Sequence, residues 1–223
     1  MQPTGWSTGL SIIIVAMLAA GTAAATEADG VMPPPEIGDD GLHKQPWFQN
    51  TFLDLGEDLQ EATAQGKRLV IMWEQRGCPY CKATHEVNLR IPRIVNYVRD
   101  NFFVLQLNLW GDREVTDFDG EALSEKALAR KYGVLFTPTL QFFPDSLAEV
   151  KDKPGNEAEV LRIPGYFKPF HFYFLFRYAN EKGYMEEPSF QRWLDGQGDK
   201  LRARGIDVED ALWQDSLDLP EDF

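Results

Sequence analysis

Residues 68–82 of the chain read RLVIMWEQRGCPYCK, and this stretch contains both of its cysteines, Cys78 and Cys81. Its first part, RLVIMW, is a short apolar run typical of a buried strand. A helix is predicted to begin directly after Cys78, because Pro79 suits the first helical position, where a missing N–H costs nothing. The stretch therefore predicts a buried strand, a turn that carries the cysteine pair, and a helix.

Three kinds of site use two cysteines at this spacing. A structural disulfide would close a loop of only a few residues and would remove little entropy from the unfolded chain. A metal site needs three or four ligands, and the chain adds three histidines to the two sulfurs, His43, His85 and His171. His85 lies one helical turn beyond Cys81, so the spacing permits a Cys-Cys-His copper or zinc site, although no fourth ligand is apparent. Lys82 stands where attachment of a c-type haem requires histidine, which excludes that group.

The third kind of site is a redox centre, and the local physics favours it. If the helix begins at Cys78, that sulfur lies at the positive end of the helix dipole, beside backbone N–H groups without helical partners. These groups stabilise a thiolate, so we expect the Cys78 thiol to have a pKa below its free value of about 8.5. Cys81 lies in the first turn and should be more buried. Cys78 would then attack a partner's disulfide, and Cys81 would resolve the mixed disulfide.

Apolar periodicity elsewhere predicts alternating helices and strands. Helices are expected at residues 55–65, 79–89, 93–101, 121–132, 170–181 and 189–204. Strands are expected at 68–73, 102–109, 140–143 and 160–163, with a polar insertion at 111–120 and a turn region at 144–156. This order predicts an α/β domain over residues 46–205, with helices on both faces of a sheet. The stretch FHFYFLFRY, residues 170–178, is most simply a core-facing helix, and an exposed part of it would be a docking surface.

The N-terminus has the features of an export signal. Residues 1–25 carry no charged side chain and include the apolar run LSIIIVAMLAA, which is shorter than the roughly 20 residues that a spanning helix needs. Ala23 and Ala25 fit the small-residue rule for cleavage, so we predict a signal peptide over residues 1–25. Lys and Arg are missing before the run, and an uncleaved anchor is the alternative. Both arrangements place the rest of the chain outside the cytoplasm, and we expect a periplasmic protein.

Two segments outside the domain have no predicted regular structure. Residues 26–45 include MPPPEIGDDG and show no apolar period, which predicts a flexible linker. Residues 206–223 form an acidic C-terminal tail without a basic residue, predicted to be mobile unless Leu212 and Trp213 dock on the domain. The whole chain has a formal net charge of −13. So acidic a surface argues against nucleic acid and anionic lipid as partners, because both attract Lys and Arg.

The sequence resembles the thioredoxin superfamily over about residues 69–165. The motifs that carry the resemblance are GCPYCK after a strand, GVLFTPTLQFF with Thr137 and Pro138 before another strand, and IPGY with Gly165. The resemblance implies the thioredoxin fold, with a central mixed β-sheet flanked by helices and with N-terminal and C-terminal helical extensions. It also implies that Pro138 is a cis-proline facing the cysteines, and that backbone groups of Thr137 pair with substrate. It implies no cofactor and no metal.

The resemblance also suggests supporting residues. Thioredoxins carry a buried acid in the strand before the motif, where this chain has Met72, and Glu74 is the nearest carboxylate. Pro79 and Tyr80 lie between the cysteines and are candidates for tuning the redox potential and contacting substrate. The CPYC centre is that of glutaredoxins rather than of thioredoxins.

More narrowly, EQRGCPYCKATHE, ARKYGVLFTPTLQFF and IPGY are similar to the exported thioredoxins of bacterial sulfur-oxidation clusters, the SoxW group. This resemblance implies a reducing role in thiosulfate oxidation. Such a protein returns oxidised cysteines on Sox proteins to the thiol state, and a membrane thiol-electron transporter reduces it in turn.

Three alternatives stay open at this point. The same centre would serve a disulfide oxidase or isomerase, because the two residues between the cysteines do not determine the potential. A copper- or zinc-handling protein would use Cys78, Cys81 and His85. A peptide-binding module would use the fold and Pro138 without turnover, although the intact cysteines disfavour it.

Overall fold

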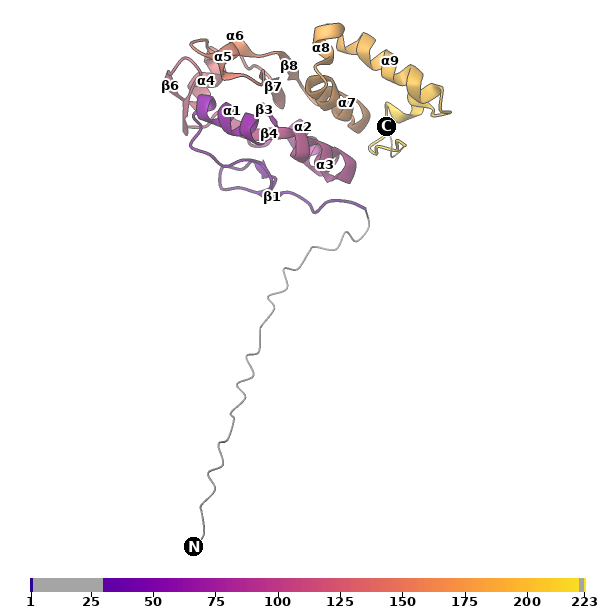
Figure 1. Cartoon of the computed structure of the whole chain (residues 1–223), viewed down its shortest axis with the longest axis horizontal. Coiled ribbons are helices and arrows are strands. Elements are labelled where there is room, and N and C mark those ends of the chain that lie inside the picture. Colours follow the sequence, from indigo (N-terminus) through magenta and orange to yellow (C-terminus); the bar gives the residue numbers. More distant parts are fainter. Residues whose placement is uncertain (2–29, 221–222) are drawn as a thin grey trace.

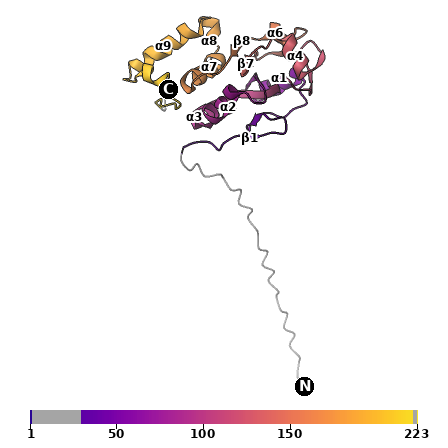
Figure 2. The same cartoon turned by 180° about the vertical axis from the view of Figure 1, so that it is seen from behind.

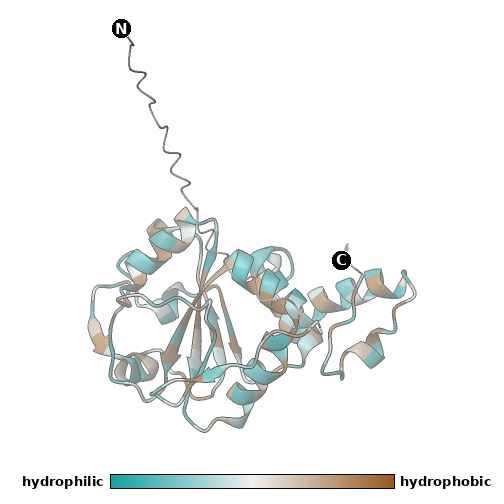
Figure 3. Ribbon diagram, turned by 90° about the horizontal axis from the view of Figure 1, so that it is seen from below, coloured by the Kyte–Doolittle hydropathy of each residue, from teal (hydrophilic) through white to brown (hydrophobic). Residues whose placement is uncertain are grey.

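The computed structural model describes residues 1, 30–220 and 223, and a four-stranded sheet forms its centre (Figure 1). β3 (Arg68–Glu74) lies between β4 (Phe102–Asn108), to which it is parallel, and β7 (Thr139–Phe142), to which it is antiparallel. β8 (Leu161–Pro164) is antiparallel to β7, which gives the strand order β4-β3-β7-β8. The predicted α/β fold with a mixed sheet between helices is therefore confirmed (Figure 3).

The longer helices lie close to their predicted positions. They are α1 (Leu55–Ala64), α2 (Pro79–Glu86), α3 (Pro92–Asn101), α4 (Glu125–Lys131), α7 (Pro169–Asn180) and α9 (Phe190–Arg202). Shorter elements are the 3-10 helix η1 (Asn88–Arg90) and the helices α5 (Leu147–Val150), α6 (Gly155–Ala158), α8 (Gly183–Glu186) and α10 (Val208–Ala211). The turn region predicted at 144–156 thus contains short helical turns.

The prediction for residues 111–124 needs correction. The segment predicted as a polar insertion contains β5 (Glu114–Thr116), which pairs with β6 (Ala122–Ser124), so the helix predicted from residue 121 begins only at Glu125. Val115 is fully buried in this hairpin and pairs with Leu123. Strands of three residues are too short to show an apolar period, which is why the sequence pattern did not predict them.

The sheet separates two apolar clusters, and β3 contributes to both. Successive side chains of a strand point to opposite faces. Val70 and Met72 accordingly pack with α3 and α7 on one face. Leu69, Ile71 and Trp73 pack with α1 and α4 on the other. β3 is therefore buried along its whole length, as its unbroken apolar sequence predicts.

The aromatic stretch at residues 170–178 faces the core, and this prediction is confirmed. Phe176 of α7 lies edge-on to Phe102 of β4 and Phe142 of β7, with ring centroids 4.9 and 5.4 Å apart. On another side of α7, Phe174 contacts Trp193 of α9 at 6.3 Å. α7 is thus enclosed between the sheet and α9 (Figures 1 and 2), which explains why a helix so apolar all round is stable in this fold.

Residues 30–45 differ from the predicted flexible linker, because they lie against the domain. β1 (Glu36–Ile37) pairs with β2 (His43–Lys44), and Leu42 between them is buried. The Met32 N–H donates to the Arg90 carbonyl oxygen at 2.8 Å. Gly and Pro suit a tight hairpin as well as a linker, and two-residue strands show no period, so composition alone gave the wrong result here.

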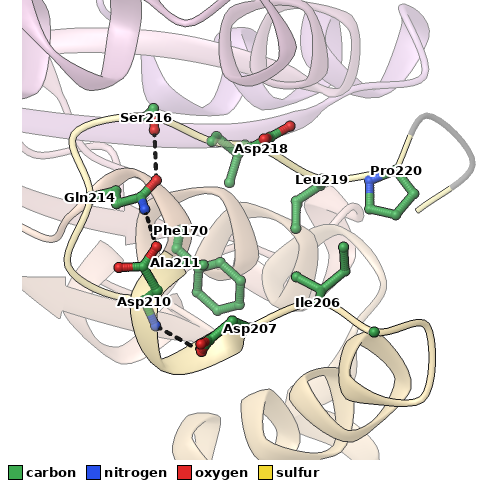
Figure 4. Close-up of a pocket in the computed structure, with 12 residues that line it drawn as sticks. Phe170, Ile206, Asp207, Asp210, Ala211, Gln214, Ser216, Asp218, Leu219 and Pro220 are labelled. Carbon is green, nitrogen blue, oxygen red and sulfur yellow. Dashed lines mark hydrogen bonds between the residues drawn. The ribbon is translucent and has the colours of Figure 1, made fainter.

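The described part of the acidic tail is likewise packed rather than mobile. Val208 and Leu219 are buried in the cluster around α7, and Leu212 packs against it, whereas Trp213 is exposed. The Arg93 guanidinium donates to the carbonyl oxygens of Leu219 and Pro220, both at 2.8 Å. A cavity of about 420 Å³ remains between the tail and α7, with Phe170, Ile206 and Leu219 among its lining residues (Figure 4).

The predicted signal peptide, residues 1–25, and the first residues of the predicted linker, 26–29, lie outside the described residues. In the described part of the chain, every helix is too short or too polar to cross a bilayer.

Phe176→Ala is expected to lower the free energy of unfolding by about 3–5 kcal/mol, because it removes a buried ring from contact with Phe102 and Phe142. Urea titration followed by circular dichroism measures the loss. Phe52→Ala is the matched control, since Phe52 is 100% exposed, and it should change stability by less than about 0.5 kcal/mol. Equal losses in the two variants would contradict this account of the core.

Candidate redox site

The cysteine pair lies where the central strand passes into a helix. β3 ends at Glu74, and residues 75–77 lead into α2. Gly77 has a φ of +73°, a left-handed conformation that glycine adopts without strain. Cys78 is the N-cap residue of α2, and Pro79 occupies the first helical position, as predicted.

Cys78 and Cys81 form a disulfide, with 5.3 Å between their Cα atoms. The backbone N–H of Cys81 donates to Cys78 Sγ at 3.0 Å. Cys78 is 7% exposed and Cys81 only 2%, so the predicted order of exposure is confirmed. On reduction the same N–H points at a thiolate on Cys78 and stabilises it, which favours Cys78 as the attacking sulfur.

The loop before β7 lies directly against Cys78. The Thr137–Pro138 peptide bond is cis, as predicted. Thr137 Oγ1 donates to Cys78 Sγ at 3.4 Å, and the Thr137 carbonyl oxygen lies 3.4 Å from the same sulfur. The Pro138 carbonyl oxygen accepts from the Gly165 N–H at 2.7 Å. The three motifs that carry the family resemblance therefore meet at Cys78.

The surface around the disulfide is apolar and aromatic. Tyr80 is 60% exposed, and its ring stacks on that of Tyr166 with 6.3 Å between centroids and 18° between planes. Leu135 and Phe136, just before Thr137, are 78% and 64% exposed. Burial, with the charge of Asp215, raises the pKa of Tyr166 to about 12, so its hydroxyl stays neutral at physiological pH. These side chains are exposed on the segments that adjoin the reactive sulfur.

Glu74 is fully buried at the end of β3, on the inner side of the cysteine pair. His85 Nε2 lies 3.0 and 3.1 Å from the two carboxylate oxygens of Glu74. The side-chain amide of Gln106, on β4, also donates to the Glu74 carboxylate. The other nitrogen of the ring, Nδ1, lies 3.2 Å from Gln45 Nε2. Glu74 is therefore held by two side chains, those of His85 and Gln106, and His85 is in turn held by Gln45.

These contacts bear on the Cys-Cys-His alternative. Both ring nitrogens of His85 are engaged, with Glu74 and with Gln45. Over residues 30–220, the structure contains no group of three or more His, Cys, Asp or Glu side chains arranged to hold a metal ion. His43 stacks on His85 at 5.6 Å, and His171 lies on α7, beside Phe170.

The sequence reasoning placed Cys78, Cys81, Pro79, Tyr80, Thr137, Pro138 and Glu74 near one another, and the structure brings them to one end of the sheet. It missed the roles of Gln45, Gln106, Leu135, Phe136 and Tyr166. The quoted motifs GVLFTP and IPGY contain the last three of these, but only the structure shows their exposure and the Tyr80–Tyr166 stack. No local pattern points to Gln45 or Gln106.

Comparison with known proteins gives the following matches. Residues 55–180 match a family described as the thioredoxin-like domain. Among solved structures, the chain is similar to a thioredoxin-fold protein from Helicobacter pylori, with 17% identity, a TM-score of 0.45, and coverage of 65% of this chain and 92% of that chain. It is also similar to a thioredoxin from Thermus thermophilus, with 25% identity, a TM-score of 0.40, and coverage of 56% of this chain and 82% of that chain. No curated protein matches the chain significantly.

Brief alkylation of the reduced protein near neutral pH should modify Cys78 before Cys81. Cys78 is the more exposed sulfur and receives the Cys81 N–H, so it has the larger thiolate fraction. Peptide mapping by mass spectrometry after a short iodoacetamide pulse identifies the modified residue. Labelling of Cys81 first would reverse the assignment of attacking and resolving cysteines.

Proposed function

The chain belongs to the thioredoxin-like domain family, and from this premise we propose that it is an exported protein-disulfide reductase. The family and the Cys78–Cys81 pair make it a thiol-disulfide oxidoreductase. The direction of electron flow, the compartment and the partners are the content of the proposal. The observation that supports the thiol-disulfide chemistry is the position of Cys78, at a helix N-terminus, with Thr137 against its sulfur and exposed apolar side chains on the adjoining segments.

The reaction begins with the reduced pair. The Cys78 thiolate attacks one sulfur of a partner's disulfide, a mixed disulfide forms, and the partner's other sulfur leaves as a thiolate that takes a proton. Cys81 then loses its proton and attacks Cys78 Sγ. The Cys78–Cys81 bond forms, the mixed disulfide breaks, and the second partner sulfur leaves. Two electrons pass from the pair to the partner, and this chain ends in the disulfide form.

The groups around Cys78 suit the first step. The Cys81 N–H and the Thr137 hydroxyl both point at Cys78 Sγ and stabilise negative charge there, which aids the first attack. The same groups make Cys78 a good leaving sulfur if the reaction runs in reverse. Tyr80, Leu135 and Phe136 would contact the partner's chain next to its disulfide and exclude water from the mixed disulfide.

The reducing direction and the partners are proposed on the sequence resemblance. EQRGCPYCKATHE and ARKYGVLFTPTLQFF are similar to the exported thioredoxins of sulfur-oxidation clusters, which supports partner proteins of thiosulfate oxidation that carry disulfides or oxidised cysteines. A reductase in an oxidising compartment needs electrons from elsewhere, and a membrane thiol-electron transporter would supply them. The predicted signal peptide supports a periplasmic location.

Replacing one cysteine at a time tests the order of steps. Reduced Cys81→Ser, mixed with a disulfide-bonded protein such as insulin, should accumulate a mixed disulfide through Cys78, because the resolving sulfur is gone. Cys78→Ser should accumulate little, since Cys81 is 2% exposed. Non-reducing electrophoresis measures both adducts, and the unaltered protein with dithiothreitol should reduce insulin catalytically.

Equal trapping by the two variants would contradict the assigned roles. Trapping without catalytic reduction of insulin by the unaltered protein would contradict the reductase proposal while leaving the roles of the cysteines intact.

A further inference from the structure

Behind the disulfide lies a closed polar cluster that the reaction above does not use. It consists of Glu74 of β3, His85 of α2, Gln106 of β4 and Gln45 of residues 30–45, which we call the N-terminal segment. Glu74 and His85 are both fully buried. A buried carboxylate is costly unless hydrogen bonds or an opposite charge compensate it, and here the imidazole and the Gln106 amide do so.

The N-terminal segment covers this cluster and sets its charged surroundings. His43 stacks on the His85 ring at 5.6 Å, and burial lowers the pKa of His43. Lys44 Nζ donates to Gln106 Oε1 at 2.8 Å and forms an ion pair with Asp40 at 2.6 Å. On the outer face of α2, Lys82 and Glu86 pair with each other at 3.6 Å. The titratable and charged groups that face His85 from neighbouring elements are therefore Glu74, His43 and, through Gln106, Lys44.

His85 also lies close to the cysteines. It follows Cys81 by one helical turn, and Cys81, Thr84 and His85 form the buried face of α2. Side chains four residues apart on a helix are neighbours, with roughly 5–6 Å between Cβ atoms. Charges in a buried setting are weakly screened, so a negative charge on the reduced cysteine pair favours the protonated form of His85.

The contacts of His85 suit two charge states. If Gln45 Nε2 donates to Nδ1, then Nε2 carries the hydrogen that is donated to Glu74 and the ring is neutral. If the Gln45 amide turns by 180°, its oxygen faces Nδ1 and accepts a hydrogen from a protonated ring. Gln45 can therefore pair with His85 Nδ1 whether or not the ring carries the extra proton.

We propose that His85 takes up a proton when the Cys78–Cys81 disulfide is reduced, and that Gln45 of the N-terminal segment makes this uptake possible. The disulfide accepts two electrons from a dithiol reductant together with two protons. One proton goes to the Cys81 sulfur and one to His85 Nδ1, while Cys78 becomes a thiolate. The net charge of the centre is then the same before and after. The proposal rests on the redox activity of the pair but not on the direction in which it works.

Counting protons tests this proposal. Glutathione oxidation releases two protons for two electrons, so a two-proton protein couple gives an equilibrium constant with glutathione that is independent of pH. A one-proton couple gives a constant that changes tenfold for each pH unit. For the unaltered protein, we expect the equilibrium constant with glutathione to change little between pH 6 and 8. For His85→Gln, we expect this constant to depart from that of the unaltered protein by up to tenfold per pH unit, over the interval in which Cys78 is a thiolate. Absorbance of the thiolate at 240 nm defines that interval in each protein.

Two further variants separate this role from a purely structural one. Gln45→Met removes the amide but keeps His85. Its equilibrium constant with glutathione should depart from that of the unaltered protein in the same direction as that of His85→Gln. His171→Gln alters a half-buried histidine on α7 and should follow the unaltered protein. A structural role alone would lower the unfolding midpoint without changing the proton count. If His85→Gln does not fold, Gln45→Met carries the test.

Identical pH profiles for the unaltered protein, His85→Gln and Gln45→Met overturn the proposal. If instead the unaltered protein fails to equilibrate with glutathione at any pH, the redox function itself fails, which is a different result.

Discussion

The register between β3 and its neighbours is the constraint on which the site depends. β3 and β4 run parallel, so Glu74 and Asn108 end them side by side. β7 is antiparallel to β3 and begins at the same end of the sheet, with Thr139 opposite Trp73. This places Thr137 and Pro138 beside Cys78. β8 is antiparallel to β7, with Pro164 opposite Thr139, and this brings Gly165 and Tyr166 to the same end of the sheet. Four chain segments therefore meet at one end of the sheet, around the disulfide, and a shift of register by one residue would separate them.

The two apolar clusters, one on each face of the sheet, hold this end of β3 in place. β3 is buried on both faces, and its alternating side chains bind it to α3 and α7 on one side and to α1 and α4 on the other. The rigid strand leaves little freedom to the helix N-terminus that follows it. Cys78 thus receives the Cys81 N–H and the Thr137 hydroxyl without any rearrangement, and such preorganised donors stabilise a developing thiolate at low cost. The N-terminal segment also contacts this end of the sheet, through His85 of α2 and Gln106 of β4.

Local sequence patterns predicted the parts of this arrangement that are local. The apolar run of β3, Pro79 after Cys78 and the aromatic α7 each carry their own signal, and family resemblance identified Pro138. The parts that the patterns missed depend on partners far away in the chain. Gln45 reaches His85 across 40 residues and Gln106 reaches Glu74 across 32, and a lone glutamine has no periodicity that reveals its partner. The β1–β2 hairpin and the packed tail were predicted as mobile because their composition suits a linker, whereas buried contacts such as those of Leu42 and Leu219 hold them in place.

We propose that the disulfide at this end of the sheet is a reducing centre. The reduction potential of the Cys78–Cys81 couple, measured by equilibration of the purified protein with glutathione buffers at pH 7, tests it most directly. The account predicts a potential in the range of thioredoxins and glutaredoxins, about −270 to −200 mV. A potential close to that of a strong periplasmic oxidant, about −120 mV, would mean that the pair donates disulfides to its partners, and it would contradict the account.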